Sequence, residues 1–243
     1  MAREPAWPPE RLYVAVDVAV CTVEERRLRV LLVRRPYEPF DGSWALPGTF
    51  GRTDETLDET ARRALEEKTG ISGVWLEQLR TYDLPPTAQA PGRDPRGRVI
   101  SVAYLALIAA TRAPHADAHA AAGWWPVDAL PGPLAFDHEA ILADGVERLR
   151  AKTRYAPVAF QLLAREFTLG ELQAVYEAVV GEQLDVRNFR RDLRAAGVIE
   201  PIGASRHEGP GRPALLYRYV PGAFAVDADE RRVAEQIARG TPE

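Results

Sequence analysis

Residues 46–71 read LPGTFGRTDETLDETARRALEEKTGI, and this stretch decides how the N-terminal half of the chain folds. The spacing of its apolar residues predicts a helix over residues 54–69, in which Leu57, Ala61 and Leu65 form one stripe against a core. A loop, an amphipathic helix and a second loop therefore follow one another here.

The same stretch resembles the Nudix box, a loop–helix–loop motif written G-x5-E-x7-R-E-U-x-E-E-x-G-U, where U is a bulky aliphatic residue. In that motif, carboxylates on one helix hold a divalent metal and a diphosphate. Six positions match the motif, namely Glu55, Arg63, Leu65, Glu67, Gly70 and Ile71. Three depart from it: Thr49 stands at the first glycine, Ala64 at the glutamate after the arginine, and Lys68 at the second of the paired glutamates. Of the three carboxylates clustered near the helix end, Glu67 alone remains.

The two missing carboxylates predict that this box holds no catalytic metal. Mg²⁺ prefers hard oxygen ligands, and a diphosphate needs its charge neutralised before water attacks. At about 100° per residue, positions 64, 67 and 68 share one helix face, whereas Glu59 and Glu66 point away from it. An ammonium group on Lys68 would also repel a divalent cation. We therefore expect no metal, no cofactor and no catalysis.

The box and its neighbours offer groups that bind a phosphorylated ligand without a metal. Lys68 can donate hydrogen bonds to a phosphate, arginines end a predicted strand beside the box, and an aromatic ring before the box can stack on adenine. Arg93, Arg96 and Arg98 predict a mobile basic loop that can close over an anion. Ordinary surface charges and core aromatic rings are the alternatives for these positions. The candidate ligand-binding residues are Arg34, Arg35, Phe40, Trp44, Gly48, Thr49, Phe50, Glu67, Lys68 and Arg98.

The elements around the box predict a mixed sheet. Strand patterns fall at residues 12–20, 28–35, 74–82, 99–109 and 123–127, and a helical pattern falls near 137–152. The Pro- and Gly-rich residues 85–98 predict a long surface loop. Helices packed against such a sheet give an α+β fold. We expect residues 1–154 to form a Nudix-type mixed-sheet α/β/α sandwich that senses a ligand.

From about residue 157 the pattern changes to short helices and a hairpin. Helices are predicted at residues 157–164, 168–180 and 185–196, and β-prone runs at 198–202 and 215–220. A capping box from Thr168 to Glu171 marks the start of the second helix. Three helices and a two-stranded wing predict a winged helix-turn-helix domain over residues 155–243. The length of the chain allows each domain its own core.

The third of these helices carries an arginine face. Val186, Phe189 and Leu193 recur with core spacing, and four arginines lie on a separate arc, as insertion into a major groove requires. Residues 187–219 contain seven arginines and three acids, which gives a local charge of +4 in a chain of net charge −4. The candidate DNA-binding residues are Arg187, Asn188, Arg190, Arg191, Arg194, Arg206, His207 and Arg212.

The remaining composition indicates the cellular setting. Cys21 is the single cysteine, so no intrachain disulfide can form, and it lies in an apolar run typical of a core. The N-terminus lacks the apolar segment of a secretory signal. The longest apolar run, residues 102–110, is well short of the roughly 20 residues that span a bilayer. These features predict a cytoplasmic protein with no membrane partner.

Beyond the box, the order and extent of several stretches resemble the Nudix-related transcriptional regulators known as the NrtR family. The stretches are residues 94–107, 134–150, 167–181, 187–201 and 211–219. This resemblance implies a repressor of cofactor-salvage or sugar-catabolism genes that senses ADP-ribose or a related NAD or sugar-phosphate metabolite. It also implies a homodimer, and the pairing of two recognition helices in turn predicts palindromic operator DNA.

Two other functions stay open at this stage. An active Nudix diphosphate hydrolase with an accessory domain would need a metal ligand from elsewhere, such as Asp83 or Asp94. A protein-interaction module would use its winged helix to bind a partner chain, and its arginines would then be a solvated helix face.

Overall fold

The computed structural model describes residues 12–84, 93–114, 121–154, 156–207 and 213–220. Within them, seven strands of the N-terminal domain form one sheet: β1 (Tyr13–Glu24), β2 (Arg27–Arg34), β3 (Trp44–Ala45), β4 (Gly48–Phe50), β5 (Trp75–Tyr82), β6 (Val99–Leu107) and β7 (Ala122–Pro126). The strand order is β3-β2-β1-β6-β5, with β4 paired to β1 and β7 paired to β2. The β1–β6 pair is parallel and the other pairs are antiparallel, so the predicted mixed sheet is confirmed.

Helices cover both faces of this sheet. They are α1 (Leu57–Thr69) and α2 (His138–Thr153), and a short 3₁₀ helix, η1 (Ala110–Arg112), follows β6. Alternation along β1 sends Val16 toward Leu65 of α1 on one face. It sends Cys21 toward Ile141 of α2 on the other face. The layers are therefore helix, sheet and helix, as the sequence predicts.

The C-terminal domain is a winged helix-turn-helix. Its elements are η3 (Pro157–Leu162), β8 (Phe167–Thr168), α3 (Leu169–Val180), α4 (Val186–Ala195), β9 (Ile199–Arg206) and β10 (Ala214–Tyr219). The three strands form a small sheet in the order β8-β10-β9. The short helix expected over residues 157–164 is a 3₁₀ helix that spans Pro157–Leu162. Four of its six residues are buried, so packing sets this short turn rather than a one-sided helical stripe.

Reciprocal side-chain caps fix the N-terminal ends of α1 and α3. In α3, the Thr168 hydroxyl accepts a hydrogen bond from the Glu171 backbone N–H, and the Glu171 carboxylate accepts one from the Thr168 N–H, which confirms the predicted capping box. Thr56 and Glu59 make the same reciprocal pair at the start of α1. Gly181 ends α3 in the left-handed conformation, at φ 83°. No helix in the described ranges is long and apolar enough to cross a membrane.

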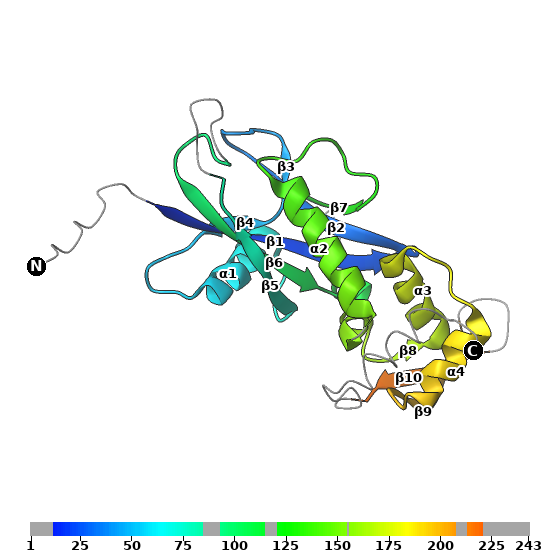
Figure 1. Cartoon of the computed structure of the whole chain (residues 1–243). Coiled ribbons are helices and arrows are strands. Elements are labelled where there is room, and N and C mark those ends of the chain that lie inside the picture. The colour runs from blue at the N-terminus through cyan, green and yellow to red at the C-terminus, as the bar shows by residue number, and fades with distance from the viewer. Residues whose placement is uncertain (1–11, 85–92, 115–120, 155, 208–212, 221–243) are drawn as a thin grey trace, which may run out of the picture.

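The two domains share one continuous core, although the length of the chain would allow each domain a core of its own. A single cluster of buried side chains runs from Cys21 of β1 through Leu149 of α2 to Tyr176 of α3 and Phe189 of α4. Figure 1 shows the C-terminal domain at the end of the sheet where β1 turns into β2, with α3 beside that turn. The winged helix is thus packed directly on the N-terminal domain.

Candidate ligand site and nucleic-acid interface

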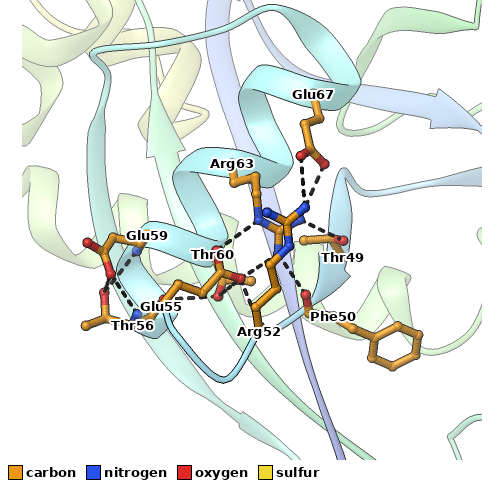
Figure 2. Close-up of polar contacts among 9 residues, drawn as sticks. All are labelled: Thr49, Phe50, Arg52, Glu55, Thr56, Glu59, Thr60, Arg63 and Glu67. Atoms are coloured by element: carbon orange, nitrogen blue, oxygen red, sulfur yellow. Dashed lines mark hydrogen bonds and ion pairs between the residues drawn. The ribbon is translucent and has the colours of Figure 1, made fainter.

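Arg63 organises the loop in front of α1. Its guanidinium donates hydrogen bonds to the Glu55 carboxylate at 2.5 and 2.9 Å and to the Phe50 carbonyl at 2.9 Å (Figure 2). It also reaches the Thr49 hydroxyl at 3.5 Å. The hydrogen bonds from Arg63 lower the pKa of Glu55 to about 2, so this carboxylate is ionised and already paired. The matched residues of the box therefore hold the loop to the helix.

Glu67, the surviving carboxylate of the cluster, lies between two arginines. Its oxygens are 3.3 Å from Arg63 and 3.5 Å from Arg52 (Figure 2). Ala64 is fully buried, and Lys68 is half-buried on the same helix face. Within the described residues, no group of three or more His, Cys, Asp or Glu side chains is arranged to hold a metal ion. The charge around Glu67 suits an anion better than a cation.

The acids that an active hydrolase would have to recruit are also paired with arginines. Asp83 forms an ion pair with Arg98. Asp94 is buried and accepts hydrogen bonds from the Arg96 guanidinium at 2.7 Å and from the Arg96 backbone N–H at 2.9 Å. Neither carboxylate is available to a metal without breaking these contacts.

A buried network of ion pairs, which the sequence analysis did not predict, joins Arg93 to acids on other elements. We call this network the floor of the candidate site. Arg93 contacts the carboxylates of Asp17 at 3.0 Å and Asp137 at 2.6 Å. The Ser101 hydroxyl donates to Asp17 at 2.6 Å, and the imidazole Nε2 of His138 lies 3.4 Å from it. Burial alone would raise the pKa of Asp17, but His138, Arg93 and Ser101 together hold it well below its usual range. The expectation that Arg93 belongs to a mobile basic loop is wrong, because its side chain is 3% exposed and paired twice.

This network explains why glycine stands at position 48. Gly48 in β4 lies opposite Asp17 in β1. A Cβ atom at Gly48 would collide with the Asp17 carboxylate and lie 2.8 Å from the Val16 carbonyl oxygen. The Leu46 backbone N–H donates to Nδ1 of His138 at 2.9 Å, so the loop that enters β4 is attached to the start of α2.

Exposed and half-buried aromatic rings gather with two arginines beside this network. We call them the aromatic cluster, comprising Arg35, Tyr37, Phe40, Phe50, Arg96 and Phe136. The Arg35 guanidinium carbon lies 4.7 Å from the Phe136 ring centre, and that of Arg96 lies 5.8 Å from the same ring. Phe40 packs edge-on against Phe136, with ring centres 4.8 Å apart. Arg96 also lies 5.6 Å from the ring of Phe50, which joins the cluster to the Nudix-like loop.

Two features set this cluster apart from an ordinary surface patch. The Nη2 atom of Arg35 is buried and has no hydrogen-bond partner among the described residues. Burial lowers the pKa of this guanidinium, so an anion would relieve its desolvation. Phe40 and Phe136 both adopt left-handed backbone conformations, at φ 66° and 57°, which cost bulky residues free energy and concentrate at functional sites.

The other candidate ligand residues lie at the margins of the cluster. Arg34 is exposed, and its Nε donates to the Gly42 carbonyl at 3.0 Å. Trp44 packs edge-on against Trp125 at 5.6 Å and adjoins the core, as its core alternative predicts. Arg98 is held at the start of β6 by its ion pair with Asp83.

In the C-terminal domain, α4 presents its arginines to solvent. Asp185 caps the helix by accepting a hydrogen bond from the Asn188 N–H at 2.8 Å. Phe189 and Leu193 are fully buried, whereas Val186 is 44% exposed, so its expected core role is wrong. Val186 is the first residue of the helix and lies beyond the edge of the core that Phe189 fills. The exposed arginines are Arg187, Arg190, Arg191 and Arg194.

These arginines divide into two rows. Arg190 and Arg194 line a cavity of about 290 Å³ together with the start of α3 and strand β10. Arg187 and Arg191 lie further round the helix, at about 100° per residue, and Arg191 pairs with Asp192 at 2.9 Å. In the wing, Arg206 forms an ion pair with Glu171 at 2.6 Å, and His207 is exposed. Arg212 lies outside the described residues.

Comparison with known proteins identifies the family. A protein of Acinetobacter baylyi named ADPR responsive transcriptional repressor NtrR is 38% identical over 210 residues, which cover 85% of this chain and 81% of that protein. The NrtR DNA-binding winged helix domain matches residues 159–219, and the NUDIX domain matches residues 12–145. This chain belongs to the NrtR family.

A solved structure of the family and a hydrolase are also similar to the chain. The NrtR of Shewanella oneidensis, crystallised with a 27mer DNA, is 37% identical, with a TM-score of 0.77, and the match covers 87% of this chain and 95% of that one. An ADP-ribose pyrophosphatase of Methanocaldococcus jannaschii is 36% identical over 134 residues, which cover 55% of this chain and 75% of that protein. The hydrolase likeness thus spans about half of the chain, whereas the NrtR likeness spans both domains.

The family matches bear on the domain division. The NUDIX match ends at residue 145 and the winged helix match begins at 159, so the expected boundary between residues 154 and 155 falls in the interval. Because α2 extends to Thr153 and its core continues into the C-terminal domain, the exact boundary stays a prediction.

Sequence reasoning missed several residues of this NrtR-family site. Asp17, Asp137 and His138 lie in the floor, and Tyr37 and Phe136 lie in the aromatic cluster. One signal was available for Asp17, which is a charged residue at the centre of the apolar strand LYVAVDVAV. A buried carboxylate of that kind requires a cationic partner, which directs attention to nearby arginines.

Proposed function

We propose that this NrtR-family protein is a transcriptional repressor that binds operator DNA through its winged helix and senses ADP-ribose, or a related NAD or sugar-phosphate metabolite, in its Nudix domain. The observation that carries the proposal is the union in one chain of four exposed arginines on α4 with a Nudix domain that has lost two metal-binding carboxylates. The name of the Acinetobacter baylyi relative supports the same ligand class.

In this proposal the aromatic cluster receives the ligand. The unpartnered Nη2 of Arg35 donates to a phosphate oxygen, and the exposed faces of Phe40 and Phe50 stack on the adenine base. Lys68 and Arg52 lie on the α1 side of the loop and complete the positive surroundings of the diphosphate. Binding then needs no metal, because the protein's own cations neutralise the ligand.

Replacing Arg35 by alanine is expected to weaken ADP-ribose binding by about 10- to 100-fold. A hydrogen bond to a charged group is worth about 1.5–3 kcal/mol, and the Nη2 atom of Arg35 has no hydrogen-bond partner among the described residues. Arg62→Ala is the control, since this exposed arginine pairs with Asp58 on α1 and is not among the candidate ligand residues. Calorimetry on the full chain with EDTA present measures both. Binding abolished by EDTA, or equal losses in the two variants, would contradict the proposed site.

The same geometry supports a Nudix domain that does not hydrolyse its ligand. Pure protein with Mg²⁺ or Mn²⁺ is expected to leave ADP-ribose and NADH intact, because Glu67 is flanked by Arg52 and Arg63 and has lost its partner carboxylates. The variant Ala64→Glu with Lys68→Glu is expected to raise Mg²⁺ affinity. Lys68→Glu alone serves as a second variant, since Ala64 is fully buried. Robust metal-dependent turnover by the wild-type protein would contradict this prediction. It would favour the alternative function, an active diphosphate hydrolase like the similar ADP-ribose pyrophosphatase.

We further infer that the protein acts as a dimer on palindromic DNA. One recognition helix reads a few base pairs, and twofold pairing places two such helices about 34 Å apart, one turn of B-DNA. Sedimentation of the protein–DNA complex measures the stoichiometry. A complex that contains one protein chain per operator would contradict the dimer.

A further inference from the structure

The turn between β1 and β2 carries an arginine from the Nudix domain onto the winged helix. Glu25 and Arg26 form the turn, both with left-handed backbones at φ 50° and 60°. The Arg26 guanidinium contacts the Glu177 carboxylate of α3 at 2.5 Å. Figure 1 shows α3 beside this end of the two strands. The Glu177 side chain is 13% exposed and the Arg26 side chain is 67% exposed, so the carboxylate is shielded from water and the guanidinium is not.

Glu177 also holds the turn of the helix-turn-helix. Its Oε1 accepts a hydrogen bond from the Leu184 backbone N–H at 3.1 Å and from the Gln173 amide at 2.9 Å. The Gln173 amide in turn donates to the Leu184 carbonyl at 3.3 Å. Leu184 immediately precedes Asp185, the cap from which α4 begins. One carboxylate therefore joins the Nudix domain to the start of the arginine-bearing helix.

Strand β2 and helix α2 both extend from the C-terminal domain to the aromatic cluster and the buried network beside it. Strand β2 runs from the turn to Arg34, next to Arg35, a span of about 25 Å at the usual rise of a strand. Helix α2 begins at His138 in the buried network, and from its last turns the Nε of Arg150 donates to the Val179 carbonyl of α3 at 3.0 Å. Two regular elements thus link the ligand site to the C-terminal end of α3.

We propose that Arg26 is a positioning residue for DNA binding: through Glu177 it fixes the helix-turn-helix turn, and thereby α4, relative to the ligand-binding domain. The inference rests on the proposed function, because it assigns the contact through which ligand binding reaches α4. A ligand changes DNA affinity only if it binds the competent and incompetent arrangements differently, and a junction that holds one arrangement supplies that difference.

The first test compares Arg26→Ala with Arg27→Ala in the full chain. Arg27 is the adjacent residue, but its partner Asp128, at 2.7 Å, belongs to the Nudix domain. Hydrogen exchange of the amides at residues 181–185 is expected to speed up in Arg26→Ala and to stay unchanged in Arg27→Ala. Operator affinity is expected to fall about two- to fivefold in Arg26→Ala, the range of a partly exposed ion pair. Equal exchange and equal affinity in the two variants would overturn the proposal.

Salt dependence separates positioning from direct contact with DNA. A positioning arginine leaves the slope of log affinity against log salt unchanged, whereas loss of one phosphate contact flattens it by about 0.9. An unchanged slope in Arg26→Ala supports the proposal, and a flattened slope overturns it.

Glu177→Gln provides the second variant, since glutamine keeps an acceptor for the Leu184 N–H and loses the ion pair. Glu177→Gln is expected to lower DNA affinity as much as Arg26→Ala does. The double variant is expected to lose no more affinity than either single variant. Arg26→Lys is expected to retain part of the affinity that Arg26→Ala loses. Additive effects would overturn the assignment of Glu177.

The ligand arm distinguishes this inference from the proposed function. The ratio of DNA affinities without and with ADP-ribose is expected to shrink in Arg26→Ala, while affinity for ADP-ribose alone stays within twofold of wild type. If ADP-ribose left the DNA affinity of the wild-type protein unchanged, the sensing function would be refuted. The hydrogen-exchange and salt-dependence measurements would still decide the role of Arg26. A full ligand response in Arg26→Ala would overturn its role in transmission.

Discussion

Replacing Arg93 by alanine is expected to destabilise the protein by about 3–5 kcal/mol at neutral pH. Removing one partner of a buried ion pair leaves the other charge uncompensated, and Arg93 here faces two carboxylates, Asp17 and Asp137. Urea unfolding measures the change. Arg62→Ala is the control, because its pair with Asp58 is half-exposed and is worth at most about 1 kcal/mol. Equal stability losses in the two variants would show that the network does not hold the fold.

The same network predicts a direction of pH dependence. The folded-state pKa of Asp17 lies well below its unfolded value of 3.8, so its charge contributes stability that is fully present above about pH 4 and is lost as the pH falls further. Asp17→Asn lacks this contribution at every pH. The stability difference between wild type and Asp17→Asn is therefore expected to narrow below about pH 4.

The second large effect is expected at the arginines of α4, and it differs between the two rows. Arg187 lies in the first turn, where recognition helices contact base edges. Arg187→Ala is expected to cost about 1–3 kcal/mol of operator binding and to relax specificity at one base pair. Arg194 faces the start of α3 and the wing, so Arg194→Ala is expected to weaken all sequences alike and to flatten the salt dependence.

Anisotropy titrations on operator and scrambled DNA, at several salt concentrations, separate these two outcomes. Arg62→Ala, whose side chain belongs to α1, again serves as the control. If Arg187→Ala lost the same affinity for operator and scrambled DNA, the base-reading role would be refuted. If Arg194→Ala kept the full salt slope, the phosphate role would be refuted.

Most of the fold could be predicted from periodic patterns of apolar residues in the sequence. The alternation along β1 and the 3.6-residue spacing in α1 and α4 reflect burial of one face, which a sequence records directly. The capping box of Thr168 and Glu171 could also be predicted, because its two residues are only three positions apart in the sequence. Val186 shows the limit of spacing, since periodicity places a side chain on a face but does not say where the core ends.

The site was harder to predict because its contacts are distant along the chain. Arg93 meets Asp17 across 76 residues and Asp137 across 44, and no local pattern encodes either pairing. The aromatic cluster combines Phe40 and Phe136 from two loops that the sheet brings together. Local composition predicted a mobile basic loop at residues 93–98, whereas desolvated acids on neighbouring elements hold Arg93 inside.

The central claim, a DNA-binding repressor controlled by a ligand in a Nudix domain, is tested most directly by one titration. Full-length protein is titrated onto DNA from upstream of its own gene at fixed, near-physiological salt, with and without saturating ADP-ribose. We expect sequence-specific binding that ADP-ribose weakens by about 5- to 150-fold, the usual range of coupling between two sites. Affinity no greater than for scrambled DNA, or unchanged by saturating ADP-ribose, would contradict it.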